Sequence, residues 1–401
     1  MSRWIVVQLG SREQYNVARA LHASGKLHTM ITDLWSPEES ILRKLSSRSA
    51  SRYHSSLSGA NIVSFNMRMV IGNMFDRYTG SRFKQAYGMI ADQTFSKVAL
   101  AYLENNNARF KREGVTHIFA YNYYSAEIFK WAKKNGYTCV LGQIDAGPAA
   151  GKLVKKLAIQ YNVDPSQFHD HYEEYLPKWQ IETGSASIIV VNSEWSRKLL
   201  VEEGVDNGKI KTIPLAFESN TGKSISKKVA AFSADQPLQV LFLGSMQIQK
   251  GVIEAFEAAK LLTGSPVRFT FAGSMKMPTE LLSRMPDENC QWIGFQNRSQ
   301  VAQLFEQHHV LLFPTHSDGF GLVQLEAQAN GLPVIASTHC GSVVTDGVNG
   351  LILENVTATE ISAAITKLLN DPGLLNSLAA NANVSKEFSF DNLVSKFSPL
   401  S

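Results

Sequence analysis

Apolar runs rich in β-branched residues alternate with segments of helical spacing over nearly the whole chain. This alternation is typical of parallel sheets whose strands are joined by crossover helices. In the first half, the pattern predicts helices over 13–24 and 125–135. The predicted strands of that half cover 4–9, 29–32, 117–120, 138–143, 187–191 and 210–213. The chain is therefore expected to be an α/β protein.

A second series of the same kind follows a polar stretch at 218–236, which is rich in Ser and Lys and has little apolar periodicity. Its predicted strands cover 239–243, 268–271, 291–293, 310–313, 333–336 and 350–353, with helices over 252–262, 299–307 and 322–330. We therefore predict a Rossmann-like domain over 1–217, a linker over 218–236 and a second Rossmann-like domain over 237–386. The final segment, 387–401, is expected to cross back and brace the first domain.

The composition fits two ordinary globular domains, with 401 residues, 44% hydrophobic residues and 18% charged residues. No stretch approaches the length of about 18 apolar residues that a membrane-spanning helix needs. The first residues are too soon interrupted to predict a signal peptide. The cysteines are Cys139, Cys290 and Cys340, which lie far apart, so neither a disulfide framework nor a zinc site is indicated. These features predict a cytoplasmic protein.

The net charge of +4 is unevenly distributed, because residues 1–100 hold 13 Lys or Arg against 6 Asp or Glu. The segments 41–48 and 67–77 mix cations with apolar residues. They fit either peripheral contact with an anionic membrane at its inner face or a solvated helix face. Because aromatic residues and zinc motifs do not interleave with the cations, nucleic acid is not an expected partner.

Glycines between a strand and a helix mark the places where open parallel sheets bind ligands. Gly10 ends the first predicted strand, and it serves either a ligand or only the turn. Gly244 and Lys250 lie in the turn after the strand 239–243, where a lysine is either a point charge for phosphate or a surface residue. This turn lacks the GxxxxGK[ST] pattern of a nucleotide triphosphatase, and no GxGxxG of a dinucleotide-binding oxidoreductase follows a strand.

The third turn of this kind, at 313–327, is the most informative. Gly319 and Gly321 remove side chains where a helix start exposes unpaired N–H groups, which favours a diphosphate bound by the amides of residues 321–323. Glu326 lies about one turn into that helix, within reach of a ribose. Asp318 precedes the helix and either caps it or faces a sugar.

The run from Pro314 to Ala336 resembles the signature of glycosyltransferase family 4, in which two acidic residues are separated by seven, as Asp318 and Glu326 are. The similarity extends through 271–274, 292–295 and 346–351, and upstream through 190–193 and 213–214. The resemblance implies the GT-B fold, in which two Rossmann-like doubly wound domains face each other across a cleft. It also implies a retaining transferase that moves a hexose-type sugar from a nucleoside diphosphate sugar to an acceptor, without a metal cofactor. The acceptor class stays open among a glycan, a lipid-linked sugar and a small molecule.

By position, the resemblance assigns the ribose to Glu326, the transferred sugar to Asp318 and the donor phosphate to Lys250, which would stabilise the leaving group. Asp145 follows a strand in the first half and is expected either to orient an acceptor hydroxyl or to form a turn. The predicted catalytic residues are Asp318, Lys250 and Asp145. The predicted donor-binding residues are Gly10, Gly244, Ser245, Lys250, Gly319, Phe320, Gly321, Leu322, Val323 and Glu326. No metal ligand is predicted, since no DxD motif is present.

Three positions depart from the pattern of that family. Asp318 stands where the family usually has Glu, which shortens the side chain by one methylene. Gln143 and Asp145 occupy the region where relatives often carry a histidine. Ser245 stands where an arginine usually partners the lysine, so one phosphate-binding cation is missing from that loop. Either another cation, Arg12 or Lys152, completes the site, or the chain is a non-catalytic GT-B subunit that binds a nucleotide sugar or a partner transferase.

Overall fold

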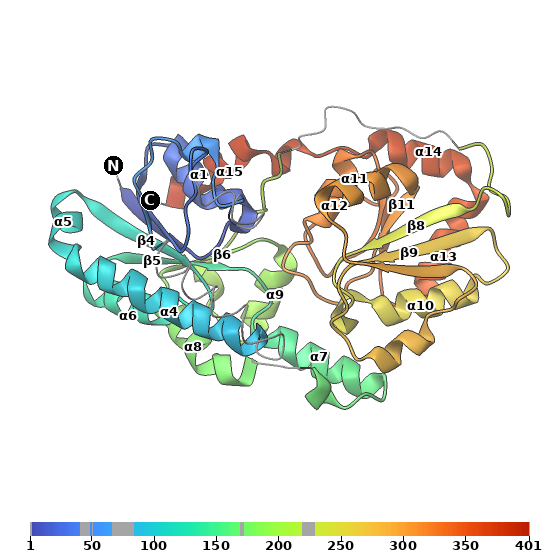
Figure 1. The fold of residues 1–401 in the computed structure, drawn as a ribbon, viewed down its shortest axis with the longest axis horizontal. Coiled ribbons are helices and arrows are strands. Elements are labelled where there is room, and N and C mark those ends of the chain that lie inside the picture. Colours follow the sequence, from blue (N-terminus) through green and yellow to red (C-terminus); the bar gives the residue numbers. More distant parts are fainter. Residues whose placement is uncertain are drawn as a thin grey trace.

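The computed structural model describes residues 2–40, 49, 51–65, 84–168, 172–218 and 229–400. Two parallel-stranded sheets, each flanked by helices, lie side by side and are joined by crossing segments (Figure 1). The basic segments 41–48 and 67–77 lie outside the described residues. None of the described helices is both long and apolar enough to cross a membrane.

The N-terminal sheet has seven strands in the order β3-β2-β1-β4-β5-β6-β7, and all neighbouring strands are parallel. Its strands are β1 Arg3–Gln8, β2 Leu27–Thr32, β3 Ile62–Ser64, β4 Val115–Tyr121, β5 Thr138–Gln143, β6 Ile188–Val191 and β7 Ile210–Thr212. The flanking helices are α1 Asn16–Ala23, α4 Lys84–Asn105, α5 Asn107–Arg112, α6 Ala126–Lys134, α8 Tyr172–Ser185 and α9 Glu194–Glu202. The strand order reverses between β1 and β4, which places a binding crevice at the carboxyl ends of these strands.

The C-terminal sheet repeats this order with six parallel strands, β10-β9-β8-β11-β12-β13. Its strands are β8 Leu238–Leu243, β9 Val267–Ala272, β10 Cys290–Gly294, β11 Val310–Phe313, β12 Val334–Ser337 and β13 Gly350–Leu353. Its helices are α10 Val252–Leu261, α11 Arg298–Gln307, α12 Val323–Ala329, α13 Ala358–Asn370 and α14 Pro372–Asn381. The order reverses between β8 and β11, so the turns after these two strands meet at the second crevice.

Two helices cross between the domains. α15 (Phe390–Phe397) lies beside α1, and its Leu393 and Phe397 are buried in the N-terminal core (Figure 1). α7 (Pro148–Gln160) follows β5, but Leu157 and Ala158 are buried in the C-terminal core, together with Tyr161 just after the helix. The end of α7 therefore packs in the second domain although it falls within the predicted first domain, 1–217.

The predicted α/β class and the two doubly wound domains are confirmed, and most strands lie within one or two residues of their expected bounds. Two expectations were wrong. The predicted helix 13–24 begins only at Asn16, because Glu13, Gln14 and Tyr15 all have positive φ angles. The edge strand β3 was missed, because three half-buried residues give no periodic signal.

Candidate active site

A cleft of about 660 Å³ lies where the two crevices face each other. Most of the predicted donor-binding residues line it, and they come from the turns after β8 and β11. From the N-terminal domain it receives the turn after β1. The lining includes Gly10, Arg12, Glu13, Asn192, Gly244, Ser245, Lys250, Asp318, Phe320, Gly321, Leu322 and Val323.

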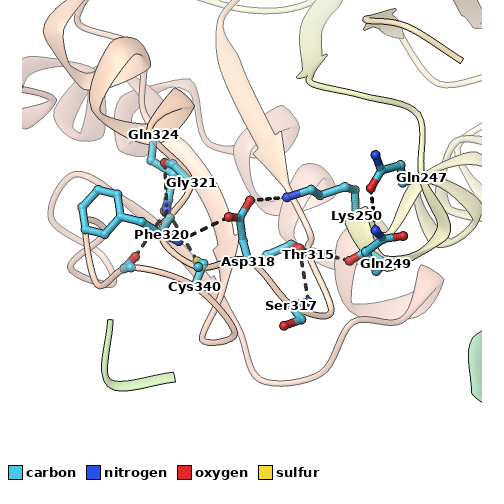
Figure 2. Close-up of polar contacts among 12 residues, drawn as sticks. Gln247, Gln249, Lys250, Thr315, Ser317, Asp318, Phe320, Gly321, Gln324 and Cys340 are labelled. Carbon is cyan, nitrogen blue, oxygen red and sulfur yellow. Dashed lines mark hydrogen bonds and ion pairs between the residues drawn. The ribbon is translucent and has the colours of Figure 1, made fainter. Parts of the chain in front are cut away.

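Lys250 and Asp318 form an ion pair at the centre of the C-terminal wall (Figure 2). Lys250 ends the short 3-10 helix 248–250 before α10, whereas Asp318 lies between β11 and α12. Both side chains are about one-fifth exposed, so Lys250 is a cleft residue and the surface alternative for it is wrong. The other oxygen of Asp318 accepts a hydrogen bond from the N–H of Phe320 at 3.2 Å. Asp318 therefore organises the loop ahead of α12 rather than capping the helix itself.

The two loops that carry this pair are joined through main-chain atoms (Figure 2). The carbonyl of Gln249 accepts hydrogen bonds from the Thr315 hydroxyl at 3.0 Å and from the His316 N–H at 2.8 Å. Gly251 has φ +73°, and a Cβ on it would lie 1.9 Å from the carbonyl oxygen of Pro314. Only glycine allows this approach, which holds the lysine turn against the loop after β11.

The amides of residues 321–323 were predicted to bind a diphosphate, and all three residues line the cleft. α12 begins at Val323, two residues after Gly321. Among the described residues, the N–H groups of Gly321 and Leu322 have no hydrogen-bond acceptor. The buried side chain of Gln324 donates to the carbonyls of Phe320 at 3.1 Å and Gly341 at 3.3 Å, which fixes the loop from behind (Figure 2). Free N–H groups on a rigid loop are suited to bind an anion.

Three predicted site residues do not line this cleft. Gly319 and Asp145 line an adjoining side pocket of about 170 Å³, which also contacts Lys250 and Asp318. Glu326 lies one turn further along α12, half-buried, and its burial raises the pKa of its carboxyl group, an effect that Arg298 partly offsets. Glu326 is thus not among the residues that line the cleft or the side pocket.

Asp145 is held by its own turn. Its Oδ1 accepts hydrogen bonds from Gln143 and from the N–H of Gly147, both at 2.9 Å. Its Oδ2 accepts the hydroxyl of Tyr123. These contacts fit the turn-forming alternative, and Gln143 serves the same turn rather than the cleft.

The two domains touch directly beside the site. A Cβ on Gly319 would lie 2.1 Å from the carbonyl oxygen of Ile144, so the loop after β11 meets the main chain of the turn after β5. From α9, the indole N–H of Trp195 donates to the Ser317 hydroxyl at 3.1 Å, and its ring packs 4.2 Å from that of His339. The cleft is therefore bounded by contacts between the domains.

Sequence reasoning missed the side chains that support the loop after β11. Glu254, 4% exposed in the first turn of α10, accepts hydrogen bonds from Tyr161 and His316. An acidic residue in a first helical turn gives no signal beyond its favourable place near the helix dipole. Gln324 lies inside the recognised motif, but its sequence position does not reveal its burial.

The titratable groups near the cleft are shifted mainly by burial. Burial raises the pKa of Glu13, and Arg12 partly offsets this. Burial, with Asp318 nearby, raises the pKa of the Cys340 thiol to about 12, which leaves it a protonated packing residue rather than a nucleophile. Among the described residues, no group of three or more His, Cys, Asp or Glu side chains is arranged to hold a metal ion.

Comparison with known proteins agrees with this arrangement. Residues 224–384 match the family model of glycosyl transferases group 1. Two solved structures superpose over the whole chain: sucrose-phosphate synthase from Thermosynechococcus elongatus (TM-score 0.64, 16% identity, 98% of that chain) and HepE from Anabaena in complex with UDP (TM-score 0.62, 14% identity, 99% of that chain). The fold is GT-B.

The GT-B chain also has curated relatives, which it matches over part of its length. An uncharacterized glycosyltransferase of Methanocaldococcus jannaschii is 31% identical over 160 residues, which cover 38% of this chain and 45% of the relative. The chain spans about half the length of the curated relatives it matches. The likeness to group 1 glycosyltransferases thus lies mainly in the domain that carries Lys250 and Asp318.

Proposed function

We propose that the protein is a retaining group 1 glycosyltransferase that moves a hexose-type sugar from a nucleoside diphosphate sugar to an acceptor. The observation that carries this proposal is the C-terminal wall of the cleft, which is lined by Lys250 and by Gly321 and Leu322, whose N–H groups have no acceptor among the described residues. A cation beside unpaired amides on a rigid loop suits a diphosphate. The family match over 224–384 and the UDP of the HepE complex support the same ligand class.

In this proposal the diphosphate lies against the loop 319–323, and Lys250 stabilises the negative charge that develops on the leaving phosphate. Asp318 holds Lys250 and faces the transferred sugar. Glu326 accepts hydrogen bonds from the ribose after closure or adjustment of α12 brings it to the cleft. The protein cations and N–H groups take the place that a divalent metal has in other transferases.

The acceptor would enter from the N-terminal side, through the side pocket between α7 and the lysine turn. Gln247 and Gln249 line this pocket opposite Asp145, and their amides can pair with hydroxyl groups. Because the oxygens of Asp145 are engaged by its turn, a front-face reaction in which the leaving phosphate helps deprotonate the acceptor fits better than catalysis by Asp145 as base. A glycan, a lipid-linked sugar and a small molecule all fit this chemistry in a cytoplasmic setting.

A second candidate is a non-catalytic GT-B subunit that binds a nucleotide sugar or a partner transferase. Ser245 is the observation that favours it, since the lysine turn carries no second cation. Turnover separates the two candidates, because a non-catalytic subunit binds donor without releasing the nucleoside diphosphate.

Thermal unfolding of the wild type and Glu326→Ala with UDP, GDP, ADP and their sugar conjugates, with and without EDTA, tests the proposal. A ligand at about 100 times its Kd adds roughly 2.7 kcal/mol to the free energy of unfolding, which raises Tm by several degrees. We expect one nucleotide class to stabilise the wild type more than Glu326→Ala, with no effect of EDTA. If none stabilises the wild type, the proposed donor site is wrong.

A further inference from the structure

The charged side chains that line the cleft are equal in number for each sign, so a bound diphosphate would give the cleft a net negative charge. Among the described residues that line it, the charged side chains are Arg12, Glu13, Lys250 and Asp318. Lys250 is already paired with Asp318. A nucleoside diphosphate brings at least two negative charges, and Ser245 supplies none of the opposite sign. A second cation is therefore needed to bind it tightly.

Arg12 reaches the cleft from the N-terminal domain. It follows β1 in the turn opposite Gly244 and Ser245, and its guanidinium lies 5.8 Å from the ring centroid of Tyr121. The turn is fixed at its main chain, since the side-chain amide of Gln8 donates to the carbonyl of Arg12 at 2.9 Å. Arg12 thus has a fixed backbone and an exposed cationic head at the cleft.

Lys152, the other cation considered for this role, lies elsewhere. Its Nζ pairs with the carboxylate of Glu203 at 2.7 Å, its side chain is 70% exposed, and it lines neither the cleft nor the side pocket. Of the two cations, only Arg12 faces Ser245 across the cleft.

The turn after Arg12 is strained. Glu13, Gln14 and Tyr15 have φ angles of 51°, 51° and 62°, a left-handed run that non-glycine residues rarely adopt. Such residues cost energy and persist only where the surroundings fix them, as at ligand clamps. Here Tyr15 is fully buried, and the Tyr121 hydroxyl donates to the Glu13 carboxylate at 3.2 Å. The run replaces the first turn of the expected helix 13–24 and keeps Arg12 at the cleft.

We propose that Arg12 is a donor-binding residue that contacts the diphosphate from the opposite domain and supplies the charge absent at Ser245. This inference rests on the proposed function, because it requires a nucleoside diphosphate in the cleft. It adds that the diphosphate bridges the domains, with Lys250 and the loop 319–323 on one side and Arg12 on the other. Donor binding then draws the two domains together.

The test is calorimetric titration of the nucleoside diphosphate that binds the wild type best, and of its parent nucleoside, into four variants. Arg12→Ala should weaken diphosphate binding roughly tenfold or more and leave nucleoside binding unchanged, as expected for a lost charge-assisted hydrogen bond. Lys152→Ala, which removes one positive charge outside the cleft, should bind as the wild type does. Arg12→Ala combined with Ser245→Arg should recover affinity, and Arg12→Lys should retain part of it.

Equal diphosphate affinity of Arg12→Ala and the wild type would overturn the inference while leaving the proposed function intact. Equal losses of affinity in Arg12→Ala and Lys152→Ala would also overturn it, because they would indicate only long-range attraction. A double variant that binds no more tightly than Arg12→Ala would overturn it as well. Wild type that binds no nucleoside diphosphate would overturn the proposed function and this inference with it. Circular dichroism checks that the exposed substitutions leave the fold unchanged.

Discussion

The two walls of the cleft belong to sheets with the same strand order. Main-chain contacts shape one wall, whereas side-chain contacts shape the other. In the C-terminal wall, main-chain contacts set the geometry: Gly251 touches the carbonyl of Pro314, and the carbonyl of Gln249 joins the two loops. In the N-terminal wall, side chains set it, through the left-handed turn 13–15 and the hydrogen bond from the Tyr121 hydroxyl to the Glu13 carboxylate. A wall made of main chain and glycines leaves a sequence pattern that relatives share. A wall made of packed side chains can be rebuilt in each protein.

This difference explains why site residues of the C-terminal wall could be assigned from sequence motifs, whereas the N-terminal half could be assigned only by its architecture. The family match covers 224–384, whereas the N-terminal half was assigned by architecture. The alternation of strands and helices sufficed for both sheets, because parallel order follows from crossover helices. Lys250 and Asp318 could be identified because each lies in a turn that follows a predicted strand.

Other features could not be predicted from the residues. The helical pattern of α7 indicates an apolar face but not which core receives it, and Tyr161 packs in the second domain. The residue types of Glu13, Gln14 and Tyr15 do not predict positive φ angles, because tertiary contacts impose such strain. The proposed role of Arg12 could not be predicted either, because it depends on the left-handed turn 13–15 and on the position of the opposite wall of the cleft.

The largest effect should come from Lys250, which carries the charge of the C-terminal wall. Lys250→Ala is expected to lower donor turnover about 10²- to 10³-fold, because one electrostatic contact to the developing charge is lost. Release of the nucleoside diphosphate from the donor measures this. Lys260→Ala, at the exposed end of α10, removes the same charge away from the cleft and should turn over normally. Equal rates for both variants would remove Lys250 from the mechanism.

The main-chain contact of the C-terminal wall can be tested with two glycines of similar backbone. Gly251 and Gly264 have φ +73° and +81°, but a Cβ at Gly264 has no neighbour within 4 Å. Gly251→Ala should lower the free energy of unfolding by roughly 2–4 kcal/mol, through both strain and the clash with Pro314. Gly264→Ala should cost only about 1 kcal/mol, because strain alone acts there. Urea unfolding compares them, and equal losses would mean that the close approach contributes nothing.

The buried carboxyl group of Glu182, on α8 of the N-terminal domain, predicts a dependence of stability on pH. Burial raises the pKa of Glu182 to about 7, although its hydrogen bonds from the N–H of Ser125 and the hydroxyl of Tyr175 lower it in part. The folded state therefore holds this proton more tightly than the unfolded state, whose value is near 4.5. The contribution of Glu182 is fully present below about pH 4.5 and is lost as pH rises to about 7. The loss is on the order of 3 kcal/mol.

Urea unfolding of the wild type and Glu182→Gln between pH 4.5 and 8 isolates this effect, because glutamine does not titrate. Glu182→Gln should be less stable than the wild type at low pH. The difference between their free energies of unfolding should shrink as pH rises. Parallel stability curves would show that Glu182 does not titrate in this range.

A smaller effect is expected where the walls meet. Gly319→Ala places a Cβ 2.1 Å from the Ile144 carbonyl and should push the domains apart, weakening donor binding by up to about tenfold. Gly184→Ala, in α8 with no neighbour within 4 Å, should bind donor normally and gain a few tenths of a kcal/mol from helix propensity. Small-angle scattering should show a larger radius of gyration only for Gly319→Ala. Unchanged affinity and radius would mean that the walls need not touch for binding.

Hydrogen exchange with and without the best-binding nucleoside diphosphate tests directly whether the loop 319–323 beside Lys250 holds a diphosphate. We expect slower exchange of the amides of Gly321 and Leu322, with protection of the turns at 244–251 and 10–15, because these segments line the cleft. Binding that leaves the amides of 319–323 unprotected, with protection confined to another surface, would contradict this expectation.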